Sequence, residues 1–310
     1  DNIVEKHSDD EVPSIAIIPF RNKGKEEDAF YAYGICEDLI SDVSSAGLIR
    51  VASKQQIEEA GKLHIDKLAK VLDVRYMANG ELWRMGDMFQ LSVELYDTKD
   101  KKVVWSDRWQ EKWDNLPMIK GSLSDGLLKA LGSKPQVENK LETTNSEAYE
   151  YYLKGIYKYN RRKDVEGAEI ARGLLQKAIE LDGGLITAEI LLGHTYLFSG
   201  NYNKAMQIYT QSLNKATTLG NKREIGHSFI ALGMIHHRKL DYDMALDYYI
   251  RSLKISEEIE DKERISSSIN NIGLLYGDKG LYNEAIKYLQ ESLKISEALD
   301  NKLSIAITLS

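Results

Sequence analysis

The chain has 310 residues, 43% of them hydrophobic and 29% charged, a composition typical of globular proteins and long enough for two domains. Its formal net charge of −7 argues against nucleic acid as the main partner, because a phosphate-binding surface normally shows as an excess of Lys and Arg. The single cysteine, Cys36, excludes an internal disulfide and a cysteine-rich zinc site, and no stretch is apolar over the roughly 18 residues of a membrane span.

Residues 12–131 alternate between short strand-like and helical stretches, as in small α/β domains. The β-branched apolar residues of 14–20 predict a buried strand, and helical spacing follows over 28–46. A strand, a helix, three strands and a closing helix are then expected over 48–53, 64–72, 74–84, 88–96, 102–109 and 118–131. This order predicts an α/β sandwich.

Several separated stretches of this region resemble the TolB-like N-terminal domain. They are the strand SIAIIPF followed by Asn22, the segments YGICEDLI and LIRVAS, and the long stretch from Leu72 to Trp109. Two positions depart from the family, because Tyr33 and Cys36 stand where Asp and Thr are common. We attach no function to either difference.

The second half of the chain repeats with a period of 40 residues. The pairs Leu192-Gly193, Leu232-Gly233 and Ile272-Gly273 mark the period. Other residues recur in step, namely Tyr202, Tyr242 and Tyr282; Ala205, Ala245 and Ala285; and Ser212, Ser252 and Ser292. A glycine inside a helix costs about 1 kcal/mol relative to alanine, so a tolerated one indicates close approach of a second helix. The pattern predicts an all-α solenoid of stacked helical hairpins.

These repeats resemble the tetratricopeptide repeat, whose usual period is about 34 residues and which often has a proline after its second helix. Here the period is longer and that proline is absent, as in the long-helix subclass of kinesin light chains and bacterial signalling proteins. We expect repeats at about 146–182, 186–222, 226–262 and 266–302, and a truncated one from 303. The region 145–310 would follow a polar linker at 132–144, and residues 1–11 would be disordered or linker.

The chain does not begin with Met, and the next repeat glycine would fall beyond Ser310. Solenoids normally end in a polar cap. We therefore expect the natural protein to extend in both directions. The resemblance implies that a TolB-like domain followed by these repeats is the C-terminal part of a signalling protein. Its effector would be a class III adenylate or guanylate cyclase, a Ser/Thr kinase or a winged-helix regulator.

No catalytic, cofactor-binding or metal-binding constellation emerges from the sequence. The Lys23–Lys25 turn lacks the glycines and hydroxyl of a phosphate-binding loop. Glu37 and Asp38 are adjacent on a helix and point about 100° apart, which favours a solvated face or a helix contact over paired acid–base catalysis. His227, His236 and His237 lack metal-site spacing.

A dense group of tyrosines opens the repeat region, at positions 149, 151, 152, 157 and 159, next to Arg161 and Arg162. Such a group could stack nucleic-acid bases. In an acidic chain we prefer a first repeat helix that packs against the domain before it.

The first helices of such repeats line the concave face of the superhelix. Counting from the repeat glycines, the residues expected to face this groove are His194, Leu197, Phe198, Ile230, Met234, His237, Arg238, Asn270, Leu274 and Asp278. The set mixes apolar and polar side chains, and it lacks the Lys, Asn and Arg combination with which some family members hold a C-terminal carboxylate. An extended peptide or a partner helix is therefore the expected ligand.

The prediction is a non-catalytic sensory and protein-interaction region of a larger bacterial signalling protein, with a nucleotide cyclase as the leading effector. The alternatives are a cell-envelope structural adaptor and the regulatory arm of a Ser/Thr kinase or transcriptional regulator. An enzyme with unrecognised residues in the α/β domain is the least favoured reading. No cofactor, nucleic acid or membrane segment is expected. A homodimer and either side of a membrane remain open.

Overall fold

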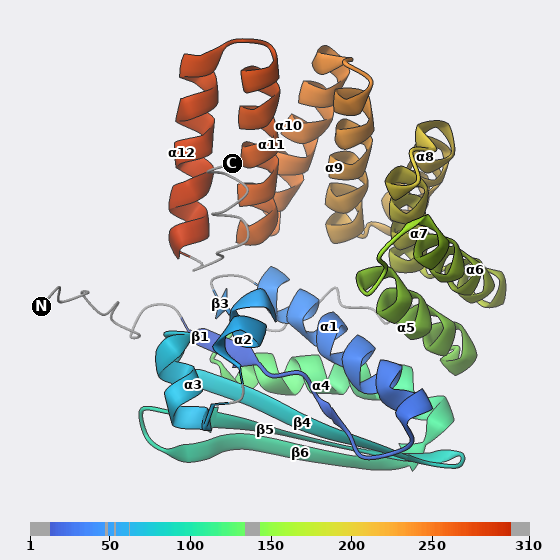
Figure 1. Ribbon diagram of the computed structural model, residues 1–310, viewed down its shortest axis with the longest axis vertical. Helices are drawn as coiled ribbons and strands as arrows, with labels where there is room; N and C mark the ends of the chain where they lie inside the picture. The colour runs from blue at the N-terminus through green and yellow to red at the C-terminus, as the bar shows by residue number, and fades with distance from the viewer. Residues whose placement is uncertain (1–12, 47–48, 53, 62, 134–142, 299–310) are drawn as a thin grey trace, which may run out of the picture.

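The computed structural model describes residues 13–46, 49–52, 54–61, 63–133 and 143–298 (Figure 1). A mixed sheet with helices on both faces comes first, and helical hairpins stack above it. We call residues 14–131 the sheet region and residues 143–298 the repeat region. No helix of the described residues is long and apolar enough to span a membrane.

The sheet region joins parallel and antiparallel strands. Its strands are β1 (Ser14–Ile17), β2 (Arg21–Asn22), β3 (Arg50–Val51), β4 (Tyr76–Met85), β5 (Met88–Asp97) and β6 (Lys102–Lys112). The order is β3-β1-β4-β5-β6, with β2 also paired to β4. Pairing is parallel among β1, β3 and β4 and antiparallel from β4 to β6. Consecutive long strands therefore form a meander, whereas β1 reaches its neighbours through helical crossovers.

Two helix layers cover the sheet. The helices are α1 (Ala29–Ser45), α2 (Lys54–Ala60), α3 (Ile65–Val71) and α4 (Leu116–Ala130), with 3-10 turns at Glu26–Asp28 and Trp113–Asn115. Side chains of a strand alternate between faces. Accordingly, Met77 of β4 packs with α2 and α3, whereas the adjacent Ala78 packs with α1 and α4.

The predicted order of strands and helices is confirmed, apart from the two-residue strand β2 and the helix α2, which the sequence did not predict. The strand expected at 48–53 is short, and the described part of it is Arg50–Val51. Positions 47, 48 and 53 lie outside the described residues. The seven residues of α2 follow at once and bury Ile57. A helix this short contains too few apolar residues for a helical period to be visible in the sequence.

The repeat region is a series of antiparallel hairpins. Its helices are α5 (Ser146–Asn160), α6 (Val165–Leu181), α7 (Ile186–Phe198), α8 (Tyr202–Leu219), α9 (Lys222–Arg238), α10 (Tyr242–Glu258), α11 (Lys262–Asp278) and α12 (Tyr282–Ala298). The repeat glycines lie where two helices of one hairpin cross. A Cβ on Gly233 would come within 2.5 Å of the Tyr249 ring, and one on Gly273 within 2.8 Å of Leu289. The predicted close approach is thus confirmed.

The two regions share one hydrophobic core. Leu153 of α5 and Leu175 of α6 belong to the same buried cluster as Ile35 and Leu39 of α1. Gly34 makes this possible, because a Cβ there would lie 2.6 Å from the Leu153 side chain. The first hairpin is therefore packed onto the sheet region, as the tyrosine-rich start of α5 predicted.

Candidate functional site

The residues predicted to line the groove lie on α7, α9 and α11, and they differ in exposure. Phe198, Arg238 and Asp278 are exposed, and Asn270 is buried at 8% exposure. The others are half-buried, namely His194, Leu197, Ile230, Met234, His237 and Leu274. Exposed and half-buried members can contact a partner, whereas Asn270 offers little surface.

Several of these residues already have partners within the chain. His237 Nε2 lies 2.8 Å from a carboxylate oxygen of Asp278, which joins α9 to α11. The guanidinium of Arg162 lies over the Phe198 ring, 4.3 Å from its centroid. The Tyr209 hydroxyl and Nδ1 of His194 share a hydrogen bond of 2.5 Å, and burial, with a smaller effect of Arg162, lowers the pKa of His194 to about 4.

A second feature, which the sequence reasoning missed, lies where α1 meets the first turns of α9 and α11. Asn221 and Asp261 cap these helices by accepting hydrogen bonds from the backbone amides of Glu224 and Arg264. The two caps are 40 residues apart and so start α9 and α11 in the same register. Equivalent first-turn side chains of neighbouring repeats therefore face the end of α1.

Arg223 of α9 reaches across to α1. Its Nη1 lies 3.0 Å from Asp42, and its Nη2 donates to the backbone oxygen and hydroxyl of Ser41 at 2.8 and 2.6 Å. Asp42 is 4% exposed and also pairs with Lys120 of α4 at 2.7 Å, and it accepts a hydrogen bond from Ser124. One carboxylate thus joins α1, α4 and α9.

Burial by itself would raise the pKa of Asp42, but Lys120 and Arg223 outweigh that effect and hold the pKa below its usual value. One turn earlier, Asp38 has the opposite balance. Burial raises its pKa, although it accepts hydrogen bonds from the hydroxyls of Tyr149 and Tyr152. Of the two alternatives expected for Asp38, a solvated face or a helix contact, the structure shows the helix contact.

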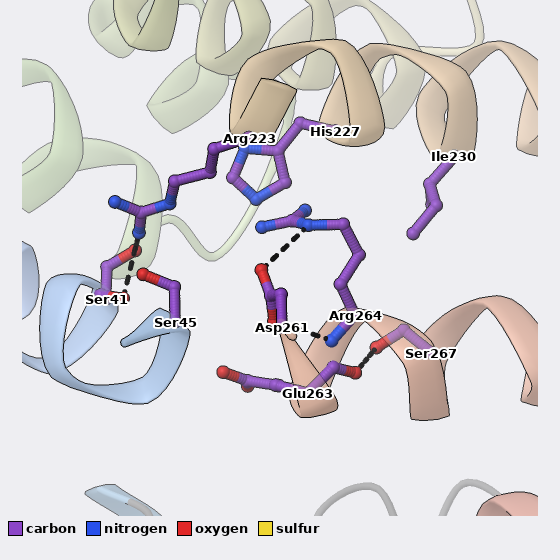
Figure 2. A pocket seen from close by; sticks show the side chains of 9 residues that line it. All are labelled: Ser41, Ser45, Arg223, His227, Ile230, Asp261, Glu263, Arg264 and Ser267. Atoms are coloured by element: carbon purple, nitrogen blue, oxygen red, sulfur yellow. Dashed lines mark hydrogen bonds and ion pairs between the residues drawn. The ribbon is translucent and has the colours of Figure 1, made fainter. Parts of the chain in front are cut away.

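Between α1, α9 and α11 lies a polar cavity of about 210 Å³ (Figure 2). We call it the junction cavity. Its lining residues are Ser41, Ser45, Arg223, His227, Ile230, Asp261, Glu263, Arg264 and Ser267. Arg264 is 9% exposed, and its Nε donates to Asp261 at 3.1 Å. Burial and the nearby Arg223 lower the pKa of Arg264 to about 9.

The charged residues of this junction depart from the repeat pattern. Arg223 and Glu224 of one repeat correspond to Glu263 and Arg264 of the next, so the order of the two charges is reversed. A charge reversal at otherwise matched positions was the available signal. Among the described residues, no group of three or more His, Cys, Asp and Glu side chains could hold a metal ion. The junction cavity can offer hydrogen bonds from arginine, histidine and serine side chains.

Known families match both regions. Models described as tetratricopeptide repeat match residues 190–223 and 224–308, and a model described as HilA/YgeH-like transcriptional regulator, second domain, matches residues 10–124. A curated relative named "Putative adenylate cyclase 3", from Rhizobium meliloti (strain 1021), is 28% identical over 247 residues. That match covers 74% of this chain and 41% of the relative, so the chain spans well under half of its length.

Solved structures give more distant likenesses. A Rap protein complexed with Competence and Sporulation Factor has 14% identity and a TM-score of 0.48, with 63% of this chain and 53% of that chain covered. TolB from Acinetobacter baumannii has 19% identity and a TM-score of 0.32, with 39% and 29% covered. Such distant likenesses say nothing of what this chain binds. The family matches and the glycine-spaced hairpins agree, and the described helices between residues 190 and 298 match the tetratricopeptide repeat.

Proposed function

We propose that this chain is a non-catalytic regulatory region of a larger bacterial signalling protein, and that its repeats bind a peptide or partner protein. The tetratricopeptide array is the observation on which the proposal rests, because stacked helix pairs of this kind form extended concave binding surfaces. We also propose the division into a TolB-like domain at 12–131, a linker at 132–144 and repeats from 145.

A nucleotide cyclase is the effector that we favour. The relative with an adenylate cyclase name matches 74% of this chain but only 41% of its own length is covered, which leaves room for an effector outside the shared part. The test is to purify the intact gene product and this chain and to assay both for conversion of ATP and GTP to cyclic nucleotides. We expect turnover by the intact product and none by this chain.

A transcriptional regulator is the second candidate, because residues 10–124 match the second domain of HilA/YgeH-like regulators. The same purified product separates the two candidates. Specific DNA binding without nucleotide turnover would replace the cyclase proposal with this one. Turnover by the 310-residue chain alone would show that the region is catalytic and would overturn both.

The groove can be tested without knowing the natural partner. A random peptide library is selected against this chain, and the recovered peptide is titrated against a variant with Phe198→Ala, Met234→Ala and Arg238→Ala. We expect binding to weaken roughly tenfold or more, about 1.4 kcal/mol. The matched control changes exposed residues of α10, Met244→Ala, Ile250→Ala and Arg251→Ala, and should keep its affinity. An equal loss of affinity in both variants, or no loss in the groove variant, would show that the peptide binds outside the predicted groove.

A further inference from the structure

We propose that the junction cavity binds an oxyanion, a carboxylate or phosphate group of a small ligand, between the guanidinium groups of Arg223 and Arg264. The cavity shares Ile230 with the predicted partner groove, but Arg223 and Arg264 lie outside the groove set, and the inference does not depend on the function proposed above. It is built by α1 of the sheet region together with α9 and α11 of the repeat region.

The cavity is large enough for a ligand. Its volume of about 210 Å³ greatly exceeds the ~10–15 Å³ that one water molecule needs by a comparable measure. Arg223 and Arg264 come from different helices and both line the cavity, and Figure 2 shows the Arg223 guanidinium beside Ser41 and that of Arg264 beside Asp261, with the ring of His227 between them. A ligand entering from solvent would meet these N–H donors together.

The two arginines keep donors that have no acceptor among the described residues. Nε of Arg223 is buried without a hydrogen-bond partner, although its Nη atoms bind Asp42 and Ser41. Arg264 uses Nε for Asp261, and its terminal nitrogens make no hydrogen bond or ion pair within the described chain. A guanidinium offers five N–H donors in a planar fork that fits a carboxylate or phosphate.

Nearby carboxylates do not supply the missing acceptors. Asp261 uses one oxygen for the Arg264 backbone amide and the other for Arg264 Nε. Asp42 is shared by Lys120, Arg223 and Ser124. Glu224 contacts His227 Nδ1 at 3.0 Å, and its charge also attracts Arg223 and Arg264 without a hydrogen bond to either. The acceptors around the cavity are therefore largely occupied while the arginine donors are not.

Glu263 is the remaining acid in the lining. Its carboxylate points toward the end of α1 in Figure 2, and Ser44 of α1 is among the groups that lower its pKa. Burial and the neighbouring Asp261 raise the pKa of Glu263, whereas the attraction of Arg223 lowers it.

The two cations differ, because burial alone would lower the pKa of Arg223 but nearby carboxylates such as Asp42 raise it, whereas burial and Arg223 lower the pKa of Arg264. The unfavourable charge is therefore the one on Arg264. Burying a charge without a complete set of partners is unfavourable, and like charges add repulsion. An oxyanion placed between Arg223 and Arg264 would offset both effects. It would also strengthen the contact between the sheet region and the later repeats, because Arg223 is already bonded to α1.

Gly226 of α9 helps to position the side chain of Arg264, which comes from α11. A Cβ on Gly226 would lie 3.0 Å from Cδ of Arg264, so glycine leaves the space in which the arginine stem crosses α9. The neighbouring repeats have Ile186 and Ser266 at this position, so the glycine is not a requirement of the repeat itself. Gly226 thus provides the space that the Arg264 side chain needs to reach the cavity.

The test uses inorganic phosphate and acetate as separate probes, at constant ionic strength set with chloride, so that general screening stays fixed. Calorimetric titration should show saturable binding to one site, and bound ligand should raise the Tm. Phosphate binding alone would identify a phosphate ligand, and acetate binding alone a carboxylate ligand. With Arg264→Gln we expect binding to weaken roughly tenfold or more, as for loss of a charged hydrogen bond.

Two further variants make the result decisive. Arg251→Gln removes the same charge from an exposed position of α10 and should bind the probes like the natural chain. Gly226→Ala keeps every charge but displaces Arg264, and should weaken binding in a folded protein. No saturable binding of either probe, or equal binding by the Arg264→Gln and Arg251→Gln variants, would overturn the site. Groove variants at Phe198 should leave probe binding unchanged, so failure here is distinct from failure of the proposed function.

Discussion

Helix α1 makes two contacts with the repeat region, and their chemistry differs. Toward α5 the contact is close and mainly apolar, with Gly34 against Leu153 and the Tyr33 and Tyr157 rings edge to face at 5.3 Å. Toward α9 and α11 it consists of charges, hydroxyls and a cavity, centred on Arg223. Both contacts involve the same helix, less than three turns apart.

The difference indicates which parts of the chain act as one body. Apolar burial is non-directional and strong for its area, so α5 and α6 should unfold together with the sheet region. A buried ion pair adds little net stability, but it favours one alignment of the two helices that it joins. Removing one partner leaves a buried charge unpaired and destabilises the fold. The later hairpins are therefore held in register by the junction, where a ligand or a mutation can change the alignment.

The largest expected effect breaks the apolar contact. Leu153→Ala removes a fully buried side chain from the shared core and should lower the free energy of unfolding by about 2–5 kcal/mol. Urea unfolding followed by both far-ultraviolet circular dichroism and tryptophan fluorescence measures it. Leu219→Ala, at a residue 65% exposed, is the control and should have little effect. A change at Leu153 no larger than that of the control would contradict a shared core.

As the pH falls, we expect the repeat region to lose stability first, through His194 of α7. The pKa of His194 is lowered to about 4 from 6.5, so protonation favours the unfolded chain. His194 therefore contributes at most about 3 kcal/mol to the free energy of unfolding. This contribution is complete above about pH 6.5 and is lost as the pH falls toward 4. The pKa of Asp42 is below its usual value, so its own contribution persists to lower pH.

Urea unfolding at several pH values tests this order. His194→Gln should be less stable at neutral pH and should lose the part of the pH dependence that lies between 6.5 and 4. His64→Gln, at a side chain that is 74% exposed, should keep that dependence. An unchanged pH profile in the His194 variant would show that this histidine is not held neutral by the fold.

Asp42→Asn tests the junction. The change leaves Lys120 and Arg223 near a neutral amide, and we expect a loss of about 1.5–3 kcal/mol, as for a hydrogen bond to a charged group. Hydrogen exchange should speed up at the start of α9 more than in α5. Asp247→Asn removes the partner of Arg251 in an exposed pair and should cost at most about 1 kcal/mol. Similar losses in both variants would mean that the junction is no more than a surface contact.

The sequence predicted the parts of the molecule that depend on local or periodic patterns. The repeat glycines, the recurring alanines such as Ala205 and Ala245, and the three strands expected at 74–84, 88–96 and 102–109 are all visible within a few residues or at a fixed spacing. The reversed charges at 223–224 and 263–264 mark the junction in the repeats but do not reveal its partner, because Arg223 and Asp42 are 181 residues apart. Their meeting depends on how α5 packs onto α1, which no single segment encodes.

The smallest effects compare one substitution at two helical glycines. Gly34→Ala places a methyl group 2.6 Å from Leu153 Cδ2 and 3.0 Å from its Cβ, and should cost about 1–3 kcal/mol through overpacking. Gly173→Ala, on α6 with nothing within 4 Å, should instead stabilise by about 1 kcal/mol through helix propensity. Urea midpoints that move in opposite directions would show that α1 and α5 need the close approach. If both variants gained stability, Leu153 would have room to move, and the contact between α1 and α5 would be looser than its geometry indicates.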